Sequence, residues 1–131
     1  MAQMVKTVAY NDVEKDVVLN PDNLFEISVL VGDTGVIANA EGKKIIPAGT
    51  PVGSSTASPL KVRNTVVTVT NTALLGENSY GVLRHDVDVT NGTTNGTLVV
   101  RGEIDSSKCP TIVAEAETAL KHIIFLNGGS Y

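Results

Sequence analysis

One short stretch of the sequence gathers residues that could bind a metal ion, His85-Asp86-Val87-Asp88. Imidazole and carboxylate groups are common metal ligands, but a site needs ligands that converge on one point. Apolar and polar residues alternate along this stretch, which predicts a β-strand whose successive side chains point to opposite faces. His85 would then face away from both aspartates. We therefore expect one packed histidine, two solvated carboxylates and no metal site.

Other patterns with catalytic potential are incomplete. The stretch around Ser79 approaches the nucleophile elbow of hydrolases, but Glu77 stands where that motif requires glycine. Cys109 is the single cysteine, so no intrachain disulfide can form, and beside Pro110 it is expected as a small, half-buried residue. Glycine-rich phosphate loops, zinc-protease motifs and Cys-x-x-Cys motifs do not occur. We expect no enzyme and no cofactor.

The composition favours a β-rich domain. The chain has 131 residues, the length of one domain, and 42% of them are hydrophobic. Tryptophan is absent and other aromatic residues are few, so the core must be built mainly from Val, Ile, Leu and Ala. Residues branched at Cβ suit the half-buried surface of a sheet.

The charge balance bears on the class of partner. Ten Lys and Arg residues against 14 Asp and Glu residues give a net charge of −4, and no basic stripe is visible. Nucleic acid is therefore not an expected partner. No apolar stretch is long enough to span a membrane, and the first residues lack the apolar segment of a signal peptide. We expect a product made in the cytoplasm with no membrane partner.

Local patterns predict most of the elements. Asn20-Pro21-Asp22-Asn23 predicts a turn, which is followed by a strand at residues 24–31 whose odd positions share one face. Residues 47–53 hold two prolines and two glycines, which predicts a kinked edge rather than a central strand. A second strand is expected at residues 62–70.

Residues 83–104 predict a β-hairpin, because two alternating segments flank a loop with Asn-Gly turn chemistry. Charge selects its register: opposite charges meet when Arg84 faces Glu103 and Asp86 faces Arg101, whereas sliding by two residues brings like charges together. The residues expected to point inward are Leu83, His85, Val87, Val89, Leu98, Val100, Gly102 and Ile104.

The end of the chain predicts one helix and one strand. Ile112, Ala116, Leu120 and Ile123 recur at helical spacing, and a proline at position 110 suits the first turn of a helix over residues 110–122. An apolar strand is expected at residues 123–126. Residues 1–20 are weakly patterned and are expected to form an N-terminal arm, and residues 21–131 a single β-rich domain.

Two stretches together resemble a known family. Ile46-Pro47-Ala48-Gly49-Thr50-Pro51-Val52-Gly53 is similar to an I-P-A-G-T-P-x-G edge in head decoration proteins of tailed bacteriophages. Residues 80–89 resemble their G-V-L-x-x-D-V-D strand, and a variable turn, a strand at 99–104 and a helix led by proline follow in the same order. The resemblance covers about residues 45–126.

The resemblance implies a fold and a function. The fold would be mainly β, a small β-tulip-like barrel or sandwich with one short C-terminal helix, as in lambda-type decoration proteins and related head-fibre proteins. The protein would form a homotrimer at three-fold sites of the virion, on the outer surface of the mature capsid, where it would bind the major capsid protein and stabilise the shell. It would be made in the cytoplasm of the bacterial host.

The resemblance also implies a place for docking, because the N-terminal segment of such proteins often extends a sheet of the capsid. An unpaired strand exposes backbone donors and acceptors that a sheet edge can satisfy. The candidate docking residues are Met4, Val5, Lys6, Thr7, Val8, Ala9 and Tyr10.

Two other functions stay open. One is a different phage structural module, a head–tail connector or a tail-tube subunit, which would form rings or tubes by itself. The other is a carbohydrate-binding β-sandwich, which is disfavoured because such proteins usually present aromatic residues to stack on sugars. Here Trp is absent and Tyr occurs three times.

Overall fold

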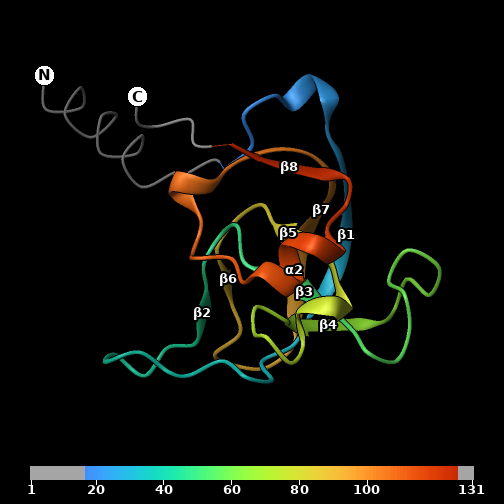
Figure 1. Ribbon diagram of the computed structural model, residues 1–131. Helices are drawn as coiled ribbons and strands as arrows, with labels where there is room; N and C mark the ends of the chain where they lie inside the picture. The colour runs from blue at the N-terminus through green and yellow to red at the C-terminus, as the bar shows by residue number, and fades with distance from the viewer. Residues whose placement is uncertain (1–16, 127–131) are drawn as a thin grey trace, which may run out of the picture.

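The fold is a small closed barrel that carries an extra strand and one short helix (Figure 1). A computed structural model describes residues 17–126. Its elements, in chain order, are η1 Pro21–Asn23, β1 Phe25–Val31, β2 Ile45–Ile46, β3 Pro51–Gly53, β4 Val66–Val69, η2 Gly76–Asn78, β5 Ser79–Leu83, β6 Val87–Asp88, β7 Thr94–Asp105, η3 Ser106–Lys108, α2 Ala114–Ala119 and β8 Ile123–Leu126. The expected class, mainly β with one short helix near the end, is confirmed.

The barrel closes because β7 pairs with strands on both of its sides. The order around the barrel is β1-β4-β3-β5-β7, and β7 then pairs back with β1. β1 and β4 pair in parallel, and the other neighbours in the barrel are antiparallel. A separate two-stranded ribbon, β2 with β6, adds Ile46 and Val87 to the core of the barrel.

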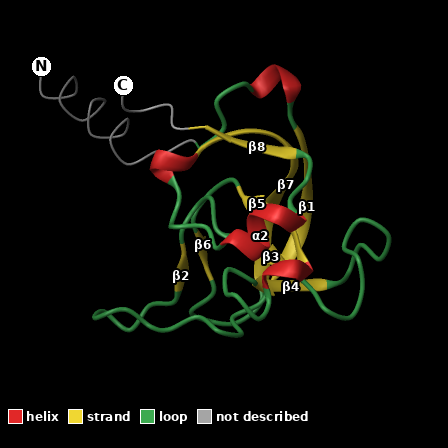
Figure 2. Ribbon diagram, in the orientation of Figure 1, coloured by secondary structure: helices red, strands yellow, loops and turns green. Residues whose placement is uncertain are grey.

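The 12-residue strand β7 links the barrel to the rest of the molecule (Figure 2). Its first part pairs with β1 and β5, and its last part pairs in parallel with β8, from Gly102 with Ile123 to Asp105 with Leu126. Val18 pairs with Ile104 from the other side. β7 therefore extends the sheet beyond the barrel.

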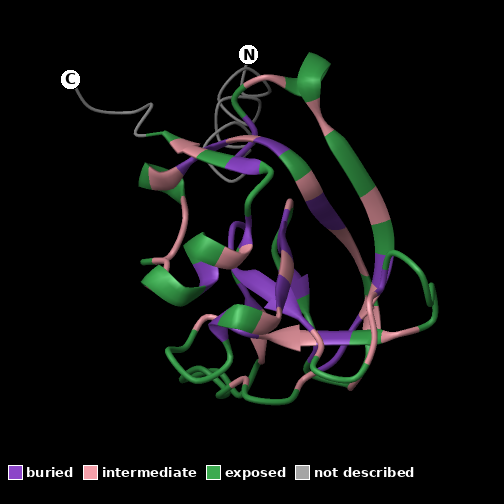
Figure 3. Ribbon diagram, turned by 45° about the vertical axis from the view of Figure 1, so that its right-hand side comes forward, coloured by how far each residue is buried: buried purple, intermediate pink, exposed green. Residues whose placement is uncertain are grey.

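Two hydrophobic cores lie against β7, one inside the barrel and one outside it. Figure 3 shows the buried residues in purple along the strands and the exposed loops around them in green. Leu98 belongs to the inner core, whereas Val99, which was expected to face solvent, belongs to the outer core and is also fully buried. Ile104 joins Val99 in the outer core, although strict alternation would place the two on opposite faces. A register shift against β1 and Gly102, at φ 155°, account for the change of face.

Several local predictions are confirmed. β1 and β8 lie where strands were expected, and the side chain of Asn20 accepts a hydrogen bond from Asp22 N to cap the turn η1. Along β1, Val29 and Val31 are buried, while Phe25 is 47% exposed because the strand shifts register beside it. The strand expected at residues 62–70 is shorter, since pairing begins at Val66.

The predicted hairpin register is wrong. β5 pairs Leu83 with Leu98, after which the chain bends and β6 pairs with β2 instead of β7. The part of β7 that was expected to face Arg84 is already paired with β8 and with residues 17–19. Arg84 therefore reaches Glu26 on β1, at 2.8 Å between Nη1 and Oε1.

The prediction that residues 47–53 form a kinked edge of the sheet is wrong. The segment turns as expected, but β3 lies between β4 and β5 and all of its residues are buried. Pro51 is tolerated because it is the first residue of the strand. Gly53 is required because a Cβ there would lie 1.8 Å from the carbonyl oxygen of Asn78.

The helix is shorter than the pattern predicted, because it begins at Ala114 rather than near Pro110. The side chain of Asn71 holds the preceding segment extended: its Nδ2 donates to the Thr111 carbonyl at 2.8 Å, and its Oδ1 accepts from Val113 N at 2.9 Å. The helix ends at Ala119. Ala116 and Leu120 are buried as predicted.

Candidate interaction surface

The predicted docking residues Met4, Val5, Lys6, Thr7, Val8, Ala9 and Tyr10 lie outside the described residues. The described chain begins at Val17, which is fully buried and accepts a 2.7 Å hydrogen bond from Asp105 N. Leu19 N donates to the Glu103 carbonyl at 2.9 Å. Residues 17–19, which were expected to belong to the arm, are thus built into the domain.

Both described ends of the chain flank the same residue of β7. Asp105 is bonded to Val17 on one side and pairs with Leu126 on the other. Three exposed apolar side chains lie on these flanking segments: Leu19 is 40% exposed, Ile124 54% and Leu126 45%. We call these three residues the terminal surface. Among the described residues, β8 is also the last strand of the sheet and carries no further strand on its outer side.

The stretches that carry the family resemblance meet in one junction. Gly49 N donates to the Leu83 carbonyl at 2.6 Å, and Leu83 N donates to the Thr50 carbonyl at 3.1 Å. Ala48 N donates to Asp86 Oδ1 at 2.8 Å. Residues 46–53 and 80–89 therefore form one hydrogen-bonded unit, in which the Asp86 carboxylate fixes the backbone at Ala48.

Cys109 packs against Gly49 of the junction. A Cβ built on Gly49, whose φ is 87°, would lie 2.4 Å from Cys109 Sγ. The thiol is half-buried and its Sγ donates to the Asp105 carbonyl at 3.4 Å. The expectation of a small, semi-buried residue is confirmed, and the contact explains why glycine stands at position 49.

An apolar groove of about 320 Å³ lies beside the junction. Ile37 stands in its wall and is 89% exposed. The residues that line the groove are Gly35, Val36, Ile37, Ile45, Ile46, Pro47, Thr50, Val69, Asn71 and Pro110. No sequence pattern predicted this groove, although the Val-Ile pair inside a loop of polar and small residues was an available signal.

The side chains of His85, Asp86 and Asp88 have separate surroundings. His85 is exposed, so the expected packed histidine is wrong. Asp86 is bonded to Ala48, and Asp88 accepts hydrogen bonds from the hydroxyl and the backbone N–H of Thr90, which lower the pKa of Asp88 below its ordinary value. Within residues 17–126, no group of three or more His, Cys, Asp or Glu side chains could hold a metal ion.

Comparison with known proteins adds no identification. No protein-family model matches the chain, and no curated protein matches it. Among the helices of residues 17–126, none is long and apolar enough to cross a membrane. The two apolar surfaces and the residues of the junction are therefore the features that bear on function.

Proposed function

We propose that this protein decorates the head of a tailed bacteriophage. In this proposal it binds the major capsid protein on the outer surface of the mature shell and stabilises the shell without catalysing a reaction. Binding of a folded partner across the joints of a shell opposes their opening by mass action, with a free energy that grows as RT ln(1 + [L]/Kd).

The observation that carries the proposal is the junction. The two stretches that resemble decoration proteins are separated by about thirty residues in the sequence, yet they are joined by hydrogen bonds from Ala48, Gly49 and Leu83. A chance similarity of common turn and strand residues has no reason to involve two segments that fold as one unit. The small barrel with one short helix also agrees with the fold that the resemblance implies.

The two apolar surfaces supply what a shell protein needs for assembly. The terminal surface lies where residues 1–16 join the domain, so an arm that extends a capsid sheet would bring Leu19, Ile124 and Leu126 toward the shell. The groove beside Pro47 with its exposed Ile37 offers a second surface, which contact between copies in a trimer would cover.

The test is direct visualisation of the particle. Capsids assembled with and without the protein would be compared by cryo-electron microscopy, and the proposal predicts added density at three-fold sites. Size exclusion with light scattering gives the oligomeric state of the free protein, expected to be a trimer or a monomer. Closed rings of six or more subunits would instead support a connector, and an unchanged capsid would refute decoration.

A further inference from the structure

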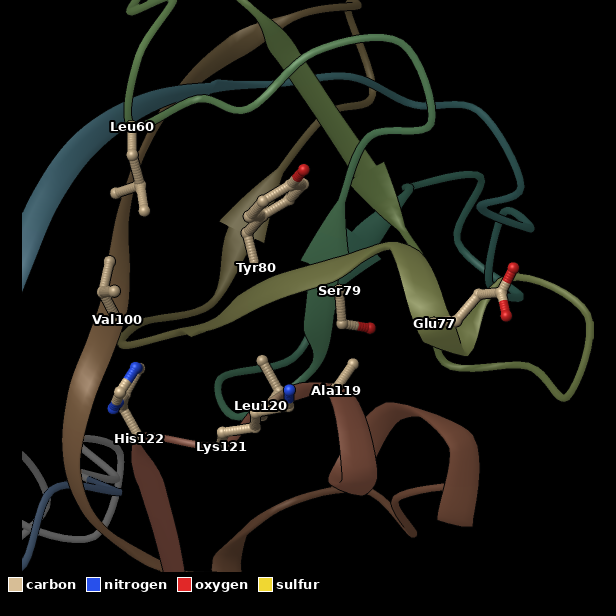
Figure 4. Close-up of a pocket in the computed structure, with 9 residues that line it drawn as sticks. All are labelled: Leu60, Glu77, Ser79, Tyr80, Val100, Ala119, Leu120, Lys121 and His122. Atoms are coloured by element: carbon tan, nitrogen blue, oxygen red, sulfur yellow. The ribbon is translucent and has the colours of Figure 1, made fainter.

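A second groove lies at the seam between the barrel and the turn that joins α2 to β8, and it shares only Tyr80 with the two stretches of the junction (Figure 4). It has a volume of about 340 Å³ and is open to solvent. Its lining residues are Leu60, Glu77, Ser79, Tyr80, Val100, Ala119, Leu120, Lys121 and His122.

One end of this groove is an apolar and aromatic platform. Tyr80 and Val100 pack partly on the barrel core, and Leu60, from the loop after β3, is 42% exposed above them. Figure 4 shows Leu60, Val100 and His122 along the same side, with the ring of Tyr80 beside them. Packing on the barrel holds the tyrosine and the valine in place, so a ligand would meet a preformed surface.

Two basic residues line the groove: His122 lies beside Val100, whereas the side chain of Lys121 extends toward Leu120 and Ala119 in the middle of the groove (Figure 4). Lys121 and His122 are both exposed, and the ion pairs seen within residues 17–126, Lys44 with Asp33 and Arg84 with Glu26, involve neither. Glu77, the acidic residue of the groove, lies at the end opposite to His122 (Figure 4). The acidic side chain of the groove is therefore separated from its basic side chains, in a chain whose net charge is −4.

We propose that this groove binds an extended acidic segment of a protein partner. An apolar side chain of the segment packs on Leu60, Tyr80 and Val100, one carboxylate of the segment accepts a hydrogen bond from His122, and a second carboxylate accepts one from Lys121. Tyrosine is enriched in protein recognition sites, and charge complementarity orients the partner. The site does not depend on the proposed decoration function, because any partner with such a segment would fit.

Charge also favours a peptide over a nucleic acid. Glu77 faces the same groove, so a polyanion that fills the whole groove would meet a negative charge, whereas a short segment can place its carboxylates at Lys121 and His122 alone. Binding to nucleic acid normally uses several phosphate contacts along a basic surface.

The probe is a dye-labelled hexapeptide of alternating aspartate and leucine, titrated with the full chain in low salt and followed by fluorescence anisotropy. A peptide of alternating lysine and leucine, with the same length and the opposite charge, is the control. The acidic peptide should bind at least about tenfold more tightly than the basic one, and added salt should weaken that binding. No binding at millimolar protein, or equal binding of both peptides, would overturn the proposal.

Charge reversal then places the binding in the groove. Lys121→Glu should weaken binding of the acidic peptide at least about tenfold, and Glu77→Lys should strengthen it. Lys108→Glu, an exposed change outside the groove, is the matched control and should have little effect. Circular dichroism checks the fold of each variant. Equal effects of Lys121→Glu and Lys108→Glu, or displacement of the peptide by oligothymidine at lower concentration than by the unlabelled peptide, would refute the assignment.

Discussion

Arg84, the first residue after β5, forms an ion pair with Glu26 of β1, with 2.8 Å between Nη1 and Oε1. The two residues are 58 positions apart in sequence. The Arg84 side chain is 21% exposed and that of Glu26 35%, so water screens the pair only in part. The pair spans β7, which lies between β5 and β1 in the barrel, and therefore ties three neighbouring strands together.

A double-mutant cycle should detect this pair. Arg84→Ala and Glu26→Ala are expected to couple by about 0.2–1 kcal/mol in the free energy of unfolding, as partly exposed ion pairs do. The matched cycle combines Arg84→Ala with Glu103→Ala, and it should show no coupling because Glu103 lies beside β8. Urea denaturation measures both cycles, and coupling to Glu103 rather than Glu26 would contradict the observed strand pairing.

Gly49→Ala should destabilise the junction. The backbone at Gly49 has φ 87°, and the added Cβ would overlap Cys109 Sγ at 2.4 Å. Gly42→Ala is the control, since φ there is 80° but nothing lies within 4 Å of the added Cβ. Both changes carry a backbone cost of about 1–2 kcal/mol, and Gly49→Ala should lose about 1–3 kcal/mol more from overpacking. Equal urea midpoints for the two variants would show that the contact with Cys109 is unimportant.

Asn71→Ala should loosen the segment that precedes α2. It removes the donor to the Thr111 carbonyl and the acceptor for Val113 N, so a loss of about 1–3 kcal/mol is expected. Asn71→Asp keeps the acceptor and should lose less. Hydrogen exchange at Val113 reports the change locally, and it should accelerate in Asn71→Ala but much less in Asn71→Asp.

The pKa of Asp88 should depend on the hydroxyl of Thr90. The hydrogen bonds from Thr90 favour the ionised carboxylate and hold the pKa below the ordinary value of 3.8. Their contribution to stability is therefore present above that value and is lost as the pH falls through the lowered pKa. Thr90→Val should raise the pKa partway, because the backbone N–H bond remains, whereas Thr90→Ser should keep it low. A carboxyl titration by NMR measures all three proteins.

The sequence predicted those elements whose signals are local. The strand β8, most of β1 and the turn η1 follow from short patterns of apolar and turn residues, and all lie within a residue or two of their predicted places. The prediction of the hairpin register was wrong because it took into account only the two strands of the hairpin and not their neighbours β1 and β8. Charge pairing could not reveal that Glu26 would compete for Arg84, or that β8 would already pair with Glu103.

The helix and the candidate surfaces show the same limit. The helical spacing from Ile112 to Ile123 is real in the sequence, but a side chain 40 residues away, Asn71, bonds to Thr111 and keeps the first part extended. The pairs that form the seam groove, such as Tyr80 with His122, come from distant segments. Such convergence depends on how the barrel closes, which no local pattern encodes.

The boundary of the N-terminal arm can be tested by truncation. Removing residues 2–10 should leave a folded protein, because Val17 keeps its bond to Asp105 and its place in the outer core. Removing residues 2–19 should destabilise the domain strongly, since it deletes the buried Val17 and Val18 together. Thermal unfolding followed by circular dichroism compares the two. Equal melting temperatures would mean that residues 17–19 contribute nothing to the fold.

Capsid binding should be lost in the shorter truncation. In the proposed function, residues Met4 to Tyr10 add a strand to a capsid sheet, and their removal takes away backbone hydrogen bonds that the rest of the domain cannot replace. Loss of about 1.4 kcal/mol of contacts weakens binding tenfold, so cosedimentation with expanded, undecorated capsids should fall at least that much. Ile124→Ser and Leu126→Ser, made together in the full chain, should also weaken binding if the terminal surface touches the shell. Full binding by the truncated protein, with loss in the serine variant, would place the docking surface on the domain rather than on the arm.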